Sequence, residues 1–301
     1  MKEFLAWLMR SRAARVGMAA LLGLVRIFGP FSGGVIALVV LRHGWLEGLL
    51  TTLGASLVLG VVEIGLVHSG LVLLTLPTLL LWWMIIGLAL VLRRTASLAL
   101  MVQAATVLGC LGVTAFFLVN PNPLEFWVPL LKVVLQPAIK ALPAISPQQW
   151  AFTISGMAMR MTGMLAASLV MTSSLAVLGG RWGQAVLYNP GGFRESFYSL
   201  RMGWPATIAA SAVFVLSALV SNGLVENLSI VLLIMFAYQG LAVIHSVVAC
   251  KRLNVGWLVA LYVLLLSMVM TLYVLAIVAG LGLIDNWFDI RARMARREQL
   301  R

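Results

Sequence analysis

Charged residues are scarce in this chain. Only 10% of its 301 residues are Asp, Glu, Lys or Arg, whereas 62% are hydrophobic. A soluble domain is closer to half apolar and a quarter charged. A chain of this length cannot hide so much apolar surface from water, so a water-soluble globular fold is excluded and the lipid bilayer is the alternative solvent. The sequence therefore predicts an all-α, polytopic integral membrane helix bundle.

Residues that build metal centres and disulfide frameworks are also scarce: there are two cysteines, three histidines and nine carboxylates. Cys110 and Cys250 fall within or at the end of apolar runs, which indicates small buried residues. Glu63 and His68 are five apart and would not share a helix face. No HExxH, GxxxxGK[ST] or GxSxG motif occurs. We expect no enzyme activity, no metal and no cofactor.

The net charge of +12 would suggest nucleic-acid binding if the basic residues formed one patch. Instead they form short clusters beside apolar runs, at Arg42, Arg93-Arg94 and Lys251-Arg252 among other places. That distribution is typical of loops on the cytoplasmic side of a membrane. We predict a multi-pass protein of the bacterial cytoplasmic membrane, with the lipid bilayer as partner and no nucleic acid.

Apolar runs separated by breaks predict about 8–10 membrane helices, including short broken ones. Residues 16–28 and 35–41 are each too short to cross a bilayer, and the break at 29–34 predicts a broken hairpin of two short helices. The proline-rich stretch 124–149 predicts amphipathic segments on the outer surface. Residues 255–283 form either one strongly tilted helix or two short ones. The full spans are predicted at 45–67, 71–92, 98–119, 150–179, 206–221 and 228–249.

The chain is predicted to be a single transmembrane domain over residues 1–301. It divides into an N-terminal bundle (16–180), a cytoplasmic loop (181–204), a C-terminal bundle (205–284) and a basic tail (285–301). Two short final helices would place the tail in the cytoplasm with the N-terminus, as the charge rule favours. The loop interleaves aromatic and charged residues, so we expect it to be ordered. Phe193, Phe197 and Leu200 predict a short amphipathic helix in it, lying on the inner membrane face.

Polar side chains inside apolar spans are costly and are therefore candidates for a binding site. Inside the spans these are Arg26, Glu63, Arg160 and His245, with Gln103 and Gln239 as neutral polar companions. The candidate ligand-binding residues among them are Arg160, Arg26, Glu63 and Gln103, whereas His245 favours a structural role. For Arg26 the alternative is a side chain that reaches the outer headgroups, and for Glu63 it is surface exposure. Arg160 lies about 15 Å into its span, so we expect it to face the bundle interior, bonded to Glu63, Gln103 or helix-end carbonyls.

Three segments carry a family resemblance. They are LRHGWLEGLL (Leu41–Leu50), NPGGFRESFYSLRMGWP (Asn189–Pro205) and GLGLIDNWFDIRAR (Gly280–Arg293). With the chain length and span pattern, they resemble the YybS-like membrane proteins of bacteria, a family without an assigned function. The first segment is also similar to the glycine-rich turn between early helices in S-components of energy-coupling-factor transporters. The resemblance implies no catalytic or ligand residue.

Two functions of different classes follow. The first is solute binding or transport, similar to an S-component, with a small-molecule solute as ligand; the broken hairpin and the intramembrane arginines motivate it. The second is a non-transporting scaffold that anchors a membrane or cytoplasmic protein partner. A sizeable polar cavity open to one side would favour the first, and a tightly packed bundle with exposed apolar grooves would favour the second.

Overall fold

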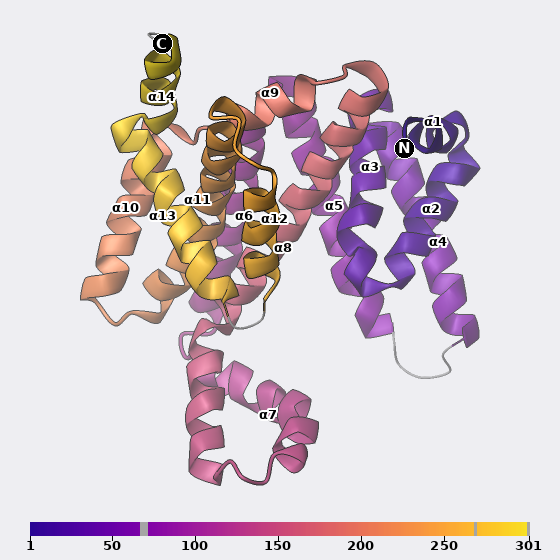
Figure 1. Ribbon diagram of the computed structural model, residues 1–301. Coiled ribbons are helices and arrows are strands. Elements are labelled where there is room, and N and C mark those ends of the chain that lie inside the picture. The colour runs from indigo at the N-terminus through magenta and orange to yellow at the C-terminus, as the bar shows by residue number, and fades with distance from the viewer. Residues whose placement is uncertain (67–71, 268–269, 300–301) are drawn as a thin grey trace.

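The computed structural model describes residues 1–66, 72–267 and 270–299, and in these ranges the chain forms helices joined by turns (Figure 1). The all-α fold is confirmed. The helices are α1 (Lys2–Arg10), α2 (Arg12–Leu24), the 3-10 turn η1 (Arg26–Phe28), α3 (Gly29–His43), α4 (Trp45–Leu66), α5 (Val72–Thr95), α6 (Leu98–Val119), α7 (Pro123–Ala141), α8 (Pro147–Tyr188), α9 (Gly192–Tyr198), α10 (Gly203–Leu219), α11 (Gly223–Cys250), α12 (Gly256–Leu266), α13 (Thr271–Phe288) and α14 (Ile290–Gln299).

The long helices present apolar side chains outward. Within the described ranges, six helices (α4, α5, α6, α8, α11 and α13) are long and apolar enough to cross a bilayer. Helices α9 and α10, bent by 51°, form a seventh if taken as one span, and α3 and α12 are shorter apolar helices. On α4 an exposed stripe follows the helical repeat: Leu46, Leu50, Leu53, Leu57 and Val61. Such a stripe requires lipid around it, so the chain is a multi-pass integral membrane protein.

The first hairpin consists of two short helices, as expected, but the break between them lies earlier in the sequence than the expected position at 29–34. Helix α2 ends at Leu24, and α3 already begins at Gly29, so residues 29–34 are helical. Pro30 is compatible with this because it lies in the first turn of α3, where its missing N–H would have no helical partner. The Ser32 hydroxyl donates to the Ala19 carbonyl (2.7 Å) and ties the two helices together.

Helix α8 packs against α3 through small residues. A Cβ added at Gly180 would lie 2.7 Å from Ala37 Cβ and 2.8 Å from the Leu38 nitrogen, so only glycine permits this approach. Helix α8 is also longer than the expected span 150–179, because Arg181–Tyr188 continue it. The connection to α10 is correspondingly shorter and contains the turn at Asn189 and helix α9. One apolar core runs from Leu8 in α1 to Ala279 in α13 and joins both halves of the chain.

The C-terminal apolar stretch forms two helices and not one tilted span. Helix α12 runs away from the end of the bundle that holds α1, and α13 runs back toward it (Figure 1). The N- and C-terminal helices therefore lie at the same end of the bundle. This confirms the two-helix alternative. The cytoplasmic location of that end stays a prediction.

Helices α7 and α8 form a hairpin that extends past the opposite end of the bundle (Figure 1). The proline-rich stretch was expected to form several surface segments, but α7 is one helix that contains Pro129 and Pro137. The hairpin has its own small core, in which Leu131 packs against Ile154 and Ala158 of α8. At 42 residues α8 is about 63 Å long, roughly twice the hydrocarbon thickness, and can reach beyond a bilayer.

Candidate functional site

A buried carboxylate lies at the end of α13, where the chain turns into α14. Asp285 is fully buried and accepts from Arg291 Nη2 (2.7 Å) and Nε (3.1 Å) on its Oδ2 atom. The two residues approach because Asp289, at a φ of 50°, ends α13 and bends the chain into α14. Arg201 donates to the Asp285 carbonyl (3.1 Å), and its Nη2 lies 3.8 Å from the carboxylate. Arg201 also pairs with the carboxylate of Asp289.

Two glutamines extend this group to the preceding loop. The buried Gln239 side chain on α11 accepts from the Met202 amide (2.9 Å) and from Asn286 Nδ2 (3.1 Å), and donates to Asp285 (3.4 Å). Gln103 on α6 donates to the Met202 carbonyl (2.7 Å). Both backbone groups of Met202 are therefore held by side chains from other helices. We call these six residues the polar clasp: Gln103, Arg201, Gln239, Asp285, Asn286 and Arg291.

The polar clasp orders the segment between α9 and α10. Arg291 also donates to the Tyr198 carbonyl, and the rings of Trp204 and Trp287 meet edge to face at 4.9 Å. The predicted short helix after Gly192 is confirmed as α9, whereas the order of the whole loop stays a prediction. Its apolar face lies elsewhere than expected, because Phe193 and Phe197 pack on the protein core.

The clasp does not resemble a catalytic centre. Its buried carboxylate is paired with arginine, and no residue there is a nucleophile held by a neighbouring base. Asp289 lies in the turn beyond α13, where the hydrogen bond from Arg201 holds its pKa below the ordinary value. Within the described ranges no group of three His, Cys, Asp or Glu could hold a metal ion. The geometry is that of an internal fastening between four helices and a loop.

Among the candidate residues whose side chains are described, the structure does not bring Arg160 and Gln103 together. Arg160 does not face the bundle interior: its side chain is 56% exposed and lies 3.6 Å from the Glu226 carboxylate. The expectation failed because the first turns of α8 belong to the protruding hairpin, so Arg160 lies near the level of the first turn of α11 instead of mid-membrane. Gln103 belongs to the polar clasp. Arg26 and Glu63 lie in η1 and α4, but their side chains are outside the described residues.

Polar residues within the apolar spans point to Gln103 and Gln239, but not to the charged members of the polar clasp. Asp285 and Arg291 lie at the edge of an apolar run, where the sequence favours a solvated tail. Their segment carries part of the family resemblance, which implies no role for it. The available signal was the interruption of a helical pattern by three acidic or basic residues over Asp285–Arg291. It shows polarity, but it does not show that Gln239, 46 residues earlier, is the neighbour.

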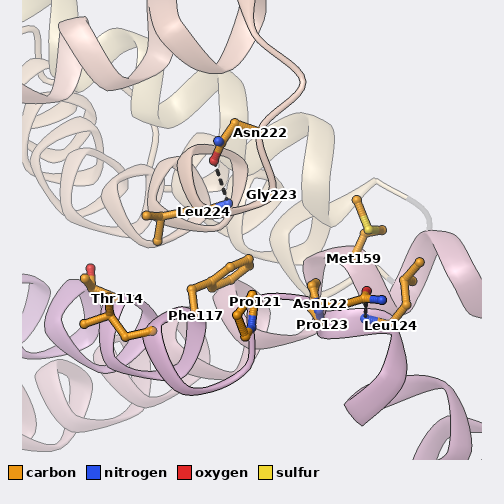
Figure 2. Close-up of a pocket in the computed structure, with 11 residues that line it drawn as sticks. Thr114, Phe117, Pro121, Asn122, Pro123, Leu124, Met159, Asn222, Gly223 and Leu224 are labelled. Carbon is orange, nitrogen blue, oxygen red and sulfur yellow. Dashed lines mark hydrogen bonds between the residues drawn. The ribbon is translucent and has the colours of Figure 1, made fainter.

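An open pocket lies at the end of the bundle from which the hairpin extends (Figure 2). It has a volume of about 510 Å³ and lies between the end of α6, the start of α7, α8 and the start of α11. Asn122 and Asn222 face it, but their side-chain oxygens accept from backbone amides at the starts of α7 and α11. Phe117, Leu118 and Met159 make the wall largely apolar.

Comparisons of the chain with protein-family models, with curated proteins and with solved structures found no match in any of the three.

Proposed function

We propose that this protein is a non-transporting membrane scaffold that presents the α7–α8 hairpin to a protein partner. The observation that carries the proposal is the outer face of the hairpin. Its inner face packs into the small core around Leu131, whereas Val133, Val134 and Phe152 are 72%, 70% and 83% exposed. Apolar side chains that extend beyond a bundle need a cover, and a partner protein supplies one.

The polar clasp supports the same proposal. Transport requires a site that opens to one side and then to the other, commonly at broken helices. Here the polar groups of the clasp are bonded to one another, and Met202 is held at both its amide and its carbonyl. A fastening of this kind favours a rigid support over an alternating-access device. The proposal includes no catalytic activity.

The charge distribution supports a bacterial cytoplasmic membrane with both termini inside. The end of the bundle that holds α1 and α14 carries Lys2, Arg10 and Arg291, and the opposite hairpin carries Lys132 and Lys140. Because basic residues concentrate on the cytoplasmic side, the hairpin points outward. Membership of the YybS-like family stays part of this proposal. Two of the segments that carry the resemblance meet in the polar clasp, through Arg201 and Asp285.

A photo-crosslinking amino acid at Val133 tests the scaffold. The matched control is Leu57 on α4, which has the same 72% exposure but lies on a membrane-crossing helix. We expect a protein adduct of one defined mass at Val133 and lipid adducts alone at Leu57. An adduct of twice the chain's mass would identify a second copy as the partner. Lipid adducts alone at both positions would mean that the hairpin lies in the bilayer, and would refute the proposal.

Solute binding is the second candidate, and the outer pocket favours it. A volume of about 510 Å³ is in the range of small-molecule sites. Because both facing asparagines cap helices, the pocket suits an apolar or amphiphilic solute better than a polar one. Native mass spectrometry of the purified protein tests this. We expect a co-purified molecule that is lost in Gly223→Leu, since a Cβ there would already lie 3.3 Å from the Phe117 ring. An empty wild-type protein would exclude a tightly held solute.

A further inference from the structure

The C-terminal end of α3 carries Arg42 and also contacts cations from other helices. Arg93 of α5 donates to the Val40 carbonyl at 2.8 Å. The guanidinium carbon of Arg42 lies 4.3 Å from the ring centre of Tyr188 on α8. Cations at a helix C-terminus complement its dipole, which explains why they tolerate one another here. The stacked face of Arg42 leaves its N–H edges available to a further acceptor.

Two more arginines lie beside this end and share one carboxylate. Arg12 and Arg15 on α2 both pair with Glu47 on α4, with Arg15 Nη1 3.4 Å from Glu47 Oε2. Arg15 also donates to His43 Nδ1 at 3.3 Å. The side chain of Arg15 is only 8% exposed, whereas that of Arg12 is 69% exposed. One carboxylate cannot balance these charges together with Arg42 and Arg93, so the site carries a net positive charge.

Helix α1 places this site at a membrane surface. Its inner face buries Leu5 and Leu8, and its outer face carries the rings of Phe4 and Trp7, stacked at 6.0 Å and about half exposed. An amphipathic helix with exposed aromatic rings and flanking basic residues is typical of the headgroup level of a bilayer. Helix α2 follows after Ser11 alone, so Arg12 lies close to the same level.

We propose that Arg12, Arg15, Arg42 and Arg93, here called the arginine cap, bind a phosphate-bearing anion, supplied by the headgroup of an anionic phospholipid. Guanidinium groups bind phosphate through paired N–H donors, which a point charge cannot do. Glu47 competes with the anion for Arg12 and Arg15. Its ion pairs hold the arginines in place when no anion is bound. This site is independent of the hairpin and of the scaffold proposal.

Native mass spectrometry of the full-length protein in detergent, titrated with phosphatidylglycerol or phosphatidylethanolamine, tests the arginine cap. We expect selective retention of phosphatidylglycerol, and about fivefold weaker binding in Arg12→Gln and in Arg42→Gln. Glu47→Gln should bind more tightly although it melts earlier, because it removes both an ion pair and a competitor. The control is Lys132→Gln/Lys140→Gln, at the opposite end of the protein, which should bind as the wild type does.

Each result decides the proposal. Equal retention of the two lipids, or unchanged binding in both arginine variants, would overturn it. Arg42→Gln is informative even if Arg12→Gln folds poorly, because Arg42 contacts Tyr188 and not Glu47. Displacement of phosphatidylglycerol by millimolar inorganic phosphate would assign the site to free phosphate. Retention in the presence of phosphate would assign it to the lipid.

Discussion

Replacement of Asp285 by asparagine should destabilise the protein far more than the same replacement at Asp289. Both carboxylates lie at the α13–α14 turn and both pair with arginine, but Asp285 is fully buried and the side chain of Asp289 is 49% exposed. Asparagine keeps the size of the side chain and removes its charge. At position 285 it leaves Arg291, whose side chain is 13% exposed, without a counter-ion.

The magnitude follows from this difference in burial. Breaking a buried ion pair by removing one partner costs roughly 3–5 kcal/mol. Arg291 keeps its bond to the Tyr198 carbonyl and some access to water, so we expect about 3 kcal/mol, or about 6–12 °C in melting temperature. Arg291→Gln should cost less, because Arg201 lies 3.8 Å from the Asp285 carboxylate and can replace the lost cation.

Thermal unfolding in detergent, followed by size-exclusion chromatography of the soluble fraction, measures these effects. The double variant Asp285→Asn/Arg291→Gln should lose less melting temperature than the two single variants lose together, because it leaves no unpaired charge at this pair. If Asp285→Asn shifted the melting temperature no more than Asp289→Asn, the buried pair would not fasten the turn. The polar clasp would then not be what stabilises this end of the bundle.

Four further predictions follow from other contacts. Gly180→Leu should abolish monodisperse protein, because the new Cβ would lie 2.8 Å from a backbone nitrogen of α3. Gly179→Leu is the control and should be tolerated, since a Cβ there has nothing within 4 Å. Size-exclusion chromatography of both variants tests this. Gln239→Leu releases the Met202 amide and should speed protease cleavage between α8 and α10 several-fold in inside-out vesicles; unchanged cleavage would mean that the remaining contacts suffice. The pKa of Asp289 in the folded protein lies below its ordinary value of 3.8. Its ion pair should therefore stabilise the fold fully at pH values above 3.8, and this stabilisation should be lost as the pH falls through the lower folded pKa. Melting temperatures of the wild type and Asp289→Asn should differ at neutral pH and converge in acid. A reporter that is active only outside the cytoplasm should be inactive when fused at Arg301. Activity there would show that the C-terminus lies outside.

Arg160 shows why the depth of a residue cannot be counted from the first apolar residue of a span. Counting inward from Trp150 placed it about 15 Å into the membrane. The helix begins earlier, at Pro147, and its first turns pack against α7 outside the bundle. Arg160 is therefore half exposed beside Glu226, and Arg160→Met should change melting little, as for other exposed ion pairs.

The polar clasp joins the loop before α10 to the C-terminal segment through contacts between residues that are distant in the sequence. The sequence shows that Arg201, Asp285 and Arg291 interrupt apolar surroundings, and it favours a loop and a basic tail there. It does not show that the loop and the tail meet. That meeting depends on the return of α12 and α13, which brings Asp285 to within 3.4 Å of Gln239 on α11.

The sequence by itself determined the solvent, the fold class and the broken hairpin of short helices near the N-terminus, whereas it left open whether the C-terminal apolar stretch forms one helix or two. These follow from local properties: the length of apolar runs, their breaks at glycine and proline, and the cost of exposing apolar surface to water. The tertiary structure alone decided that α8 outreaches the bundle and that Arg160 is exposed. It also decided that Asp285 is buried and that four arginines gather around α3. Those outcomes depend on which helices pack together. The strength of a charge interaction depends on the neighbours and the burial of the charged group, and a local pattern of residues encodes neither.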